Sequence, residues 1–207
     1  MSRFFAALYD PFMRKTEDAC LGEWRRALLA EARGDVLEVG AGTGINLPFY
    51  PAGLGSLTAS EPDIHMRKKA EARAHALGKD ICFVAAPVEA LPFPDESFDV
   101  VVATLLLCSV PSPELALASI RRVLKPNGLF LFLEHVAAED NPGRLVWQKR
   151  IEPVWSVLAE GCRLTCHTLD TIRAAGFLVD DPKRESMRKA MPFLRPTVRG
   201  VAKKALA

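Results

Sequence analysis

Residues 35–44 read Asp-Val-Leu-Glu-Val-Gly-Ala-Gly-Thr-Gly, a short apolar run that leads directly into a turn with glycine at every second position. The apolar residues are typical of a strand that is buried on both faces, as in a parallel sheet covered by helices. Gly40, Gly42 and Gly44 permit positive φ and carry no Cβ, so a ligand can approach the free N–H groups of the following helix. The stretch therefore predicts a cofactor-binding turn at the end of a parallel strand.

The spacing of the glycines separates two classes of cofactor. The dinucleotide fingerprint has glycine or alanine three residues after its second glycine, and Ile45 stands at that position here. The pattern Glu-x-Gly-x-Gly-x-Gly instead resembles the first motif of class I S-adenosylmethionine-dependent methyltransferases. In that reading, Glu38 suits the ammonium group of the methionine moiety.

Composition limits the class of protein and its partners. The chain of 207 residues is long enough for one domain with a substantial core, and its net charge of +2 is too small to indicate nucleic acid. No apolar run approaches the length of a membrane span, and the N-terminus lacks the features of a secretory signal. We therefore expect a cytoplasmic monomer or homodimer with a small-molecule substrate and no integral membrane association.

The cysteines do not predict a metal centre. None of the five forms a Cys-x-x-Cys pair, which favours reduced thiols over a zinc ribbon or a redox motif. Cys162, Cys166 and His167 are close enough in sequence to suggest a metal site, but no fourth ligand lies nearby. We therefore expect no metal ion in this protein.

The N-terminal residues 1–33 predict a helical cap. Phe4, Leu8 and Phe12 recur every four residues, and basic residues flank this helical stripe. We expect the stripe to pack over the active site, with Tyr9 in reach of a substrate. Two alternatives stay open, namely a simple cover for the core and a weak peripheral contact with a membrane surface.

The second and third strands end in groups that suit an adenosine. The strand at residues 57–60 leads to Glu61, whose carboxylate can accept hydrogen bonds from both ribose hydroxyls, although it can also cap the next helix. After the third strand, Pro87 stands where the methyltransferase pattern has an acidic residue. We therefore expect the backbone of Val88 or the side chain of Glu89 to hold the adenine.

The fourth and fifth strands are expected to end at the same edge of the sheet. Residues 98–107 form a continuous run in which residues 99–104 match the fourth strand of similar proteins, and there Thr104 and Leu105 at its end face the cofactor. The fifth strand is apolar until Glu134 and His135, which alternation sends to opposite faces. His135 is our candidate catalytic residue, because an imidazole can accept the proton of a thiol acceptor or lower its pKa. A histidine bound only to structural groups is the alternative.

Residues 143–167 predict a helical insert on the substrate side of the fold. Trp147, Ile151 and Trp155 have helical spacing, which Pro153 is expected to interrupt. Large aromatic side chains over a cofactor cleft make the apolar wall that a hydrophobic substrate needs, although ordinary core packing would give the same stripe. The candidate substrate residues are Tyr9, Cys108, Trp147 and Trp155.

The motifs together resemble a known family over most of the chain. The segments 37–46, 61–62, 91–93, 98–110, 124–128 and 134–136 are similar to a type 11 methyltransferase domain. More narrowly, the segments 104–110, 134–139, Trp155 with 161–165, and 195–196 resemble the mammalian membrane-associated alkyl thiol methyltransferases of the methyltransferase-like group. Those proteins have an N-terminal hydrophobic anchor that this sequence lacks, so we do not expect their attachment to the endoplasmic reticulum or to lipid droplets.

The resemblance implies a fold, a cofactor and a set of binding residues. We expect residues 1–207 to form a single Rossmann-like α/β domain with a seven-stranded, mostly parallel sheet, an antiparallel last strand and helices on both faces. The cofactor is expected to be S-adenosyl-L-methionine, with S-adenosyl-L-homocysteine as product. The candidate cofactor-binding residues are Glu38, Gly40, Ala41, Gly42, Thr43, Gly44, Asn46, Glu61, Pro62, Val88, Glu89, Thr104 and Leu105.

The expected activity is methyl transfer to a small hydrophobic acceptor, with a thiol as the first choice. Methylation of a phospholipid, an amine or a quinone-like acceptor at N, O or C stays open, because bacterial phospholipid and quinone methyltransferases share the general motifs. Two other classes also stay open, a nicotinamide-dependent oxidoreductase and a cofactor-binding protein without catalysis.

Overall fold

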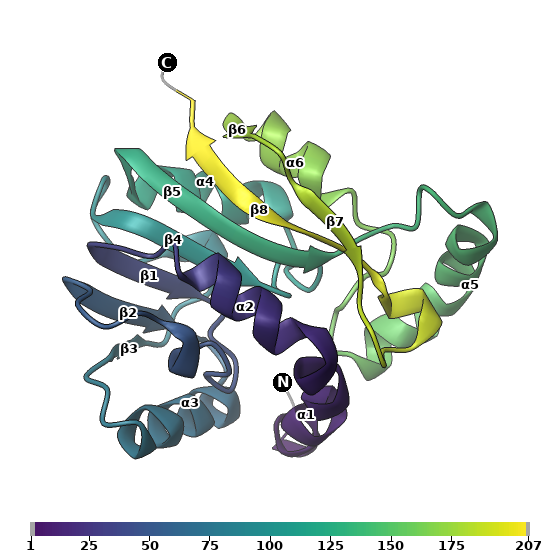
Figure 1. The fold of residues 1–207 in the computed structure, drawn as a ribbon, viewed down its shortest axis with the longest axis horizontal. Coiled ribbons are helices and arrows are strands. Elements are labelled where there is room, and N and C mark those ends of the chain that lie inside the picture. Colours follow the sequence, from purple (N-terminus) through teal and green to yellow (C-terminus); the bar gives the residue numbers. More distant parts are fainter. Residues whose placement is uncertain (1–2, 206–207) are drawn as a thin grey trace.

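The computed structural model describes residues 3–205, which form one twisted sheet with helices on both faces (Figure 1). The strands are β1 (Asp35–Val39), β2 (Ser56–Ser60), β3 (Cys82–Val84), β4 (Phe98–Thr104), β5 (Leu124–His135), β6 (Phe177–Val179), β7 (Lys183–Ser186) and β8 (Pro196–Lys204). The helices are α1 (Arg3–Thr16), the π-helix η1 (Glu17–Leu21), α2 (Gly22–Leu29), α3 (Ile64–Ala76), α4 (Pro113–Val123), α5 (Pro142–Leu158) and α6 (Thr168–Ala174). Three short 3-10 turns are η2 (Leu47–Phe49), η3 (Val88–Ala90) and η4 (Pro192–Leu194).

The strand order confirms the expected Rossmann-like sheet. The main path runs β3-β2-β1-β4-β5-β8-β6, in which β3, β2, β1, β4 and β5 are parallel and β8 is antiparallel to both of its neighbours. In Figure 1 the arrows of β5 and β8 accordingly point in opposite directions. From β1 the chain continues to β2 and β3 on one side of β1, and it then crosses to β4 on the opposite side of β1. A crevice at the carboxyl ends of β1 and β4 is the expected ligand site of such a sheet.

The structure contains one strand, β7, that the sequence did not predict. β7 pairs with the first half of β8, whereas β6 pairs with its second half. The sequence of β7 is Lys-Arg-Glu-Ser, so it has none of the apolar alternation that identifies a strand. Backbone pairing to β8 and an ion pair between Arg199 and Glu185 (2.6 Å) hold it in place.

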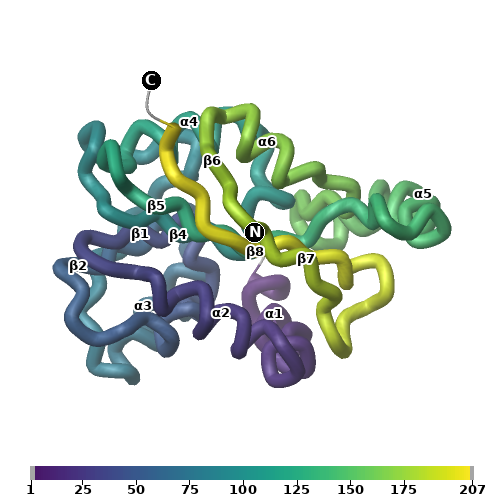
Figure 2. The backbone as a smooth tube through the Cα atoms, turned by 45° about the horizontal axis from the view of Figure 1, so that its top comes forward, coloured from purple at the N-terminus to yellow at the C-terminus, as the bar shows by residue number. Residues whose placement is uncertain are grey.

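Alternate side chains of the central strands form a core on each face of the sheet. Val101 of β4 and Phe130 of β5 pack on one face with residues of α4 and α6. Val100 and Leu131 pack on the other face with residues of α2. Figure 2 shows α4 and α6 together on one side of the sheet and α2 on the other. This two-sided burial explains why the central strands read as continuous apolar runs.

Two prolines lie inside helices. The interruption predicted at Pro153 is wrong, because α5 continues through that residue to Leu158. α1 likewise contains Pro11 and joins η1 and α2 in one continuous helical segment. Tertiary contacts hold α5 in place on either side of the proline, since Gln148 bonds to the backbone of Val136 and Phe193 and the ring of Trp155 packs against Phe193. No helix within residues 3–205 has the length and apolarity needed to cross a bilayer.

Candidate active site

A cavity of about 400 Å³ lies at the carboxyl ends of β1, β2, β4 and β5, where the strand order predicts a ligand site. Its wall comes from α1, the glycine turn, the ends of the strands, the end of α5 and the segment 187–194. The structure brings these predicted site residues to the wall: Tyr9, Gly40, Ala41, Gly42, Thr43, Glu61, Thr104, Leu105, Cys108, His135 and Trp155. An open hollow of about 1020 Å³ between α4 and α6 is lined mainly by charged surface residues and lies away from this edge.

The glycines after β1 have the positive φ that their sequence predicts, but the helix expected after them is wrong, because only the three-residue 3-10 turn η2 stands between β1 and β2. Gly40 and Gly44 have φ values of 62° and 74°, in the left-handed region that favours glycine. A Cβ at Gly40 would lie 2.4 Å from a methyl carbon of Leu106, and one at Gly44 would lie 3.0 Å from the Cα of Ala70. The turn therefore packs directly against the loop after β4 and against α3, and a side chain at either position would clash with these neighbours.

The sequence left two roles open for Glu61, binding the ribose and capping the next helix, and in the structure Asp63 takes the capping role. The side chain of Asp63 caps α3 by accepting hydrogen bonds from the N–H groups of His65 and Met66, both at 2.9 Å. Glu61 instead lines the cavity and accepts hydrogen bonds from the N–H groups of Gly42 and Asp63, both at 2.9 Å. Burial raises the pKa of Glu61, although these bonds to its charged form oppose the shift.

Glu38 lies behind the turn and not on the cavity wall. Its two carboxylate oxygens accept hydrogen bonds from Asn46 Nδ2 (2.8 Å) and from the hydroxyl of Tyr50 (3.0 Å). Burial raises the pKa of Glu38 to about 7. Asn46 also donates to Thr104 Oγ1 (2.9 Å), and Thr104 does line the cavity. The carboxylate of β1 is thus linked to the cavity through an amide and a hydroxyl.

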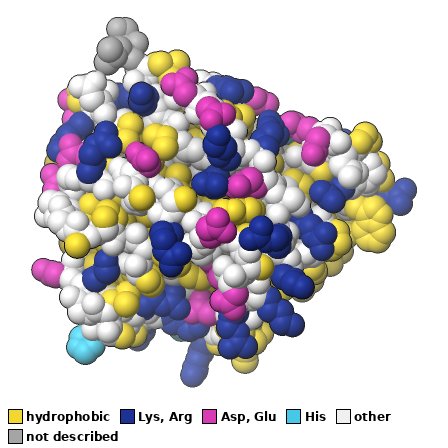
Figure 3. Space-filling view, viewed as in Figure 1, with side chains coloured by type: hydrophobic (Ala, Val, Ile, Leu, Met, Phe, Trp, Pro, Cys, Tyr) yellow, Lys and Arg dark blue, Asp and Glu magenta, His cyan; other side chains and the backbone are white. Residues whose placement is uncertain are grey.

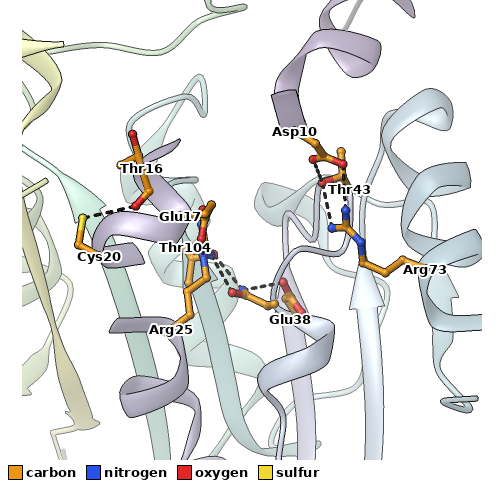
Figure 4. A network of polar contacts seen from close by, with 10 residues as sticks. Asp10, Thr16, Glu17, Cys20, Arg25, Glu38, Thr43, Arg73 and Thr104 are labelled. Atoms are coloured by element: carbon orange, nitrogen blue, oxygen red, sulfur yellow. Dashed lines mark hydrogen bonds and ion pairs between the residues drawn. The ribbon is translucent and has the colours of Figure 1, made fainter. Parts of the chain in front are cut away.

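Arg25 completes this network, and sequence analysis missed it. Its Nη1 donates to Asn46 Oδ1 (2.7 Å) and to Thr104 Oγ1 (2.8 Å), while Nη2 pairs with Glu17 (3.0 Å). Figure 4 shows how α2, η1 and the ends of β1 and β4 bring these groups together. Arg25 is only 1% exposed yet lines the cavity, so it places a cation beside the turn. An arginine next to Trp24 on the buried face of a helix was the available signal.

α1 is fastened to the glycine turn by a second polar group. Asp10 accepts a hydrogen bond from Thr43 Oγ1 (2.6 Å) and forms an ion pair with Arg73 of α3 (2.9 Å) (Figure 4). Lys69 donates to the carbonyl oxygen of Ala6 (2.7 Å). These contacts hold α1 across the cavity, with Tyr9 on the wall. Burial raises the pKa of the Tyr9 hydroxyl, so it is neutral at physiological pH.

The opposite end of the cavity carries two thiols and an imidazole. Cys162 Sγ lies 2.9 Å from His135 Nε2 and 3.9 Å from Cys108 Sγ. The contact with Cys108 and burial raise the pKa of the Cys162 thiol, which therefore stays protonated at neutral pH. Glu134 points away from this cluster and accepts hydrogen bonds from backbone N–H groups, which confirms that only one of the two neighbours on β5 faces the cavity.

The remaining predicted residues lie off the cavity wall. This group consists of Glu38, Gly44, Asn46, Pro62, Val88, Glu89 and Trp147. Trp147 is 64% exposed and lies off the cavity wall, although it has helical spacing with Trp155, which lines the cavity. Glu89 has a buried oxygen, Oε1, without a hydrogen-bond partner among residues 3–205. Such an atom can accept a bond from a ligand.

Comparison with known proteins gives the family. Residues 37–132 match the family model described as Methyltransferase domain. Human thiol S-methyltransferase TMT1A is 33% identical over 203 residues, which cover 97% of this chain and 83% of the relative. Rat thiol S-methyltransferase TMT1B is 41% identical over 145 residues, covering 69% of this chain and 59% of the relative. A phosphatidylethanolamine N-methyltransferase of Cereibacter sphaeroides is 33% identical over 139 residues, or 66% of this chain and 67% of the relative.

Solved structures share the fold at lower identity. A methyltransferase from Aquifex aeolicus that depends on S-adenosylmethionine has a TM-score of 0.66 and 18% identity, covering 98% of each chain. The [4+2]-cyclase SpnF has a TM-score of 0.72 and 22% identity over 90% of this chain and 80% of its own. The cyclase illustrates that the fold alone does not determine the reaction. The glycine turn, the strand order and the relatives together show that this chain belongs to the methyltransferases that use S-adenosyl-L-methionine.

Proposed function

We propose that this enzyme transfers a methyl group from S-adenosyl-L-methionine to the thiol of a small hydrophobic acceptor, with a thioether as product. The observation that carries the proposal is the position of His135, whose imidazole lies at an otherwise largely apolar end of the cavity. A thiol reacts as its thiolate. A group at this end of the cavity that accepts the thiol proton, or lowers the pKa of the thiol, therefore assists the reaction. The names of the TMT1A and TMT1B relatives support the same acceptor.

The residues around the turn fit this cofactor. The turn packs too closely at Gly40 for a side chain, the carboxylate of Glu61 faces the cavity, and Oε1 of Glu89 is buried without a partner. We assign Glu61 to the ribose hydroxyls and Glu89, with the backbone of Val88, to the adenine amino group. Arg25 is our candidate for the cofactor carboxylate, because it is the buried cation on this part of the wall. The cofactor supplies an electrophilic methyl group on a sulfonium.

The protein contributes mainly position and the exclusion of water. Phe5, Leu8 and Phe12 of α1 and Trp155 of α5 line the acceptor side of the cavity. Trp155 packs against Phe193 with ring centroids 5.3 Å apart. We accordingly propose residues 1–33 as a cap and residues 143–167 as a substrate-side insert. The weak membrane-surface contact of α1 stays a prediction, supported by its exposed Phe4, Leu8 and Phe12.

The acceptor class is tested with a panel of alkyl thiols, amines, phenols and phospholipids, by measuring the release of S-adenosylhomocysteine. We expect turnover with the hydrophobic thiols and little with the others. Turnover confined to amines, phenols or lipids would contradict the thiol assignment while leaving the methyltransferase family intact. Identification of the methylated product by mass spectrometry confirms which atom receives the methyl group.

The role of His135 is tested by the substitution His135→Ala. We expect affinity for S-adenosylhomocysteine to stay within a few-fold of wild type, because His135 lies at the acceptor end, while turnover on a thiol falls by about 10²-fold or more. His65→Ala is the matched control, since His65 is exposed on α3. Unchanged turnover in His135→Ala would remove His135 from the mechanism.

A further inference from the structure

We propose that Cys108, His135 and Cys162 bind a soft divalent metal ion, Zn²⁺, and that its fourth coordination position takes the thiolate of the acceptor. Successive members of this set are 27 residues apart in the chain, so no local sequence motif identifies the site. The proposal deepens the thiol methyltransferase function and rests on it for the identity of the fourth ligand. It also gives His135 a specific role, as a ligand that helps to form the thiolate.

The donor atoms are already close to the positions that zinc requires. Cys108 Sγ, His135 Nε2 and Cys162 Sγ all lie within 4.8 Å of one another. Tetrahedral zinc with ordinary bond lengths places neighbouring donor atoms roughly 3.5–3.8 Å apart. The observed separations of 3.9 Å between the sulfur atoms and 2.9 Å between Cys162 Sγ and His135 Nε2 bracket that range. The third separation, between Cys108 Sγ and His135 Nε2, is also below 4.8 Å, so small side-chain movements would bring all three donor atoms to one zinc ion.

The backbone around each cysteine is fixed by a carboxylate. Glu134 accepts hydrogen bonds from the N–H groups of Leu106 (2.9 Å) and Leu107 (3.0 Å), immediately before Cys108. Glu152 of α5 accepts bonds from the N–H groups of residues 164 and 165, both at 2.7 Å, shortly after Cys162. The two loops are also joined directly, because the N–H of Arg163 donates to the carbonyl oxygen of Cys108 (2.8 Å). The backbone that carries the two cysteines is thus held in place before a metal ion binds. Such preorganisation is expected of a binding site and not of side chains that meet by chance.

The donor set and its surroundings select the ion and leave one position open. Two thiolates and one imidazole favour zinc over the hard ions magnesium and calcium. Three protein ligands with a vacant fourth position are typical of a catalytic zinc site, whereas structural sites are closed. All three side chains line the cavity, so the vacant position faces the space assigned to the acceptor.

The proposed step balances as follows. Binding of Zn²⁺ releases one proton from each cysteine thiol, and binding of the acceptor thiol as a thiolate releases a third proton to solvent. The thiolate sulfur then forms a bond to the methyl carbon while the bond between that carbon and the sulfonium sulfur breaks. The electron pair of the broken bond stays on the sulfur of S-adenosylhomocysteine. The neutral thioether is a weak zinc ligand and leaves the site.

Cobalt titration of the full-length protein tests metal binding without any reliance on activity. We expect Co²⁺ to produce a sulfur-to-cobalt charge-transfer band in the near ultraviolet and intense visible bands of tetrahedral coordination. Cys108→Ser and Cys162→Ser should each weaken Co²⁺ binding by at least tenfold. Cys166→Ser is the matched control, because Cys166 is a nearby thiol outside the cluster. Absence of the charge-transfer band in wild type, or its persistence at full affinity in both variants, overturns the proposal.

Addition of an alkyl thiol to the Co²⁺ enzyme separates this proposal from the proposed function. A change in the visible bands, at thiol concentrations near its KM, supports coordination of the acceptor. If metal-stripped enzyme binds no cobalt but still methylates thiols at the wild-type rate, the metal proposal fails and thiol methylation stands with His135 as a simple proton acceptor. If cobalt binds but thiols neither shift the bands nor become methylated, the fourth-ligand assignment and the thiol acceptor both fail.

Discussion

At the scale of single residues, the carboxylate at the end of β2 provides a direct test of the cofactor site. Glu61→Gln keeps the shape of the side chain but removes its charge, which weakens its bonds to hydroxyl groups and to the Gly42 N–H. We expect affinity for S-adenosylhomocysteine, measured by calorimetric titration, to fall by about tenfold or more. Glu71→Gln on the exposed side of α3 should leave affinity unchanged. Equal affinities for the two variants would exclude Glu61 from the site.

The buried carboxylate of Glu38 predicts a pH dependence of stability. Its pKa is about 7 in the folded protein and near the ordinary 4.5 in the unfolded chain. Between these values the folded state binds more protons, so this residue's contribution to the free energy of unfolding decreases as pH rises from about 4.5 to 7. Below pH 4.5 the contribution is fully present, and above pH 7 it is lost.

The measurement is urea unfolding of wild type and Glu38→Gln at several pH values. The other titratable groups contribute equally to both proteins and cancel in the difference between their free energies of unfolding. Wild type should therefore lose stability relative to the variant by up to about 1.4 kcal/mol per pH unit between about pH 5 and 7. The difference should be constant above about pH 8. A difference that does not vary with pH across this window would show that Glu38 is ionised throughout.

Sequence reasoning correctly placed single residues at the cavity where they follow a recognisable strand. The glycines of the turn, Glu61 and His135 were found because each follows a strand that the apolar pattern identifies. Arg25 was missed because its partners, Asn46 and Thr104, are 21 and 79 residues away. No periodicity connects groups at such separations, and a charged side chain on a helix is ordinarily solvated.

At the scale of elements, the strength of the contact between α1 and the glycine turn can be tested. The side chain of Asp10 makes the Thr43 and Arg73 contacts that hold this helix across the cavity. In Asp10→Ala we expect backbone amides of residues 5–14 to exchange hydrogen at least several-fold faster and the KM for the acceptor to rise. Asp18→Ala, at an exposed position in η1, is the control. Unchanged exchange would show that apolar contacts alone hold α1.

The elements themselves were predicted to differing degrees for a physical reason. β1, β4 and β5 are buried on both faces, so both faces require apolar side chains and their sequences are recognisable as apolar runs. β7 is polar and exists through its pairing with β8, which a local pattern does not record. α5 passes through Pro153 because contacts of Gln148 before the proline and of Trp155 after it outweigh the local cost of a missing N–H.

At the scale of the whole molecule, three distant segments form an apolar mouth to the cavity. Leu8 and Phe12 of α1 and Leu158 of α5 line the cavity yet are 65%, 52% and 69% exposed, and the segment 187–194 completes the wall. Figure 3 shows further hydrophobic side chains gathered over the tip of α5, at the right of the view. An opening of this kind favours substrates with an apolar tail.

The prediction at this scale concerns chain length in a series of alkyl thiols. We expect kcat/KM to rise by about two- to fourfold for each added methylene until the tail extends beyond the mouth, because each buried methylene contributes about 0.8 kcal/mol. Phe12→Ser should flatten this dependence, whereas Val157→Ser, at a position that is exposed but outside the cavity wall, should not. A flat series in wild type would contradict an acceptor site built from these segments.

The sequence by itself determined the strand and glycine turn at the cavity, the parallel core of the sheet and the family, because each depends on local backbone conformation and on a repeating pattern of burial. The tertiary structure alone decided which side chains meet at the cavity. The packing of α1 and α5 against the strand ends unites Arg25 with Thr104 and brings His135 to two cysteines. Such meetings depend on how distant elements pack, and a linear sequence records the elements but not the distances between their side chains.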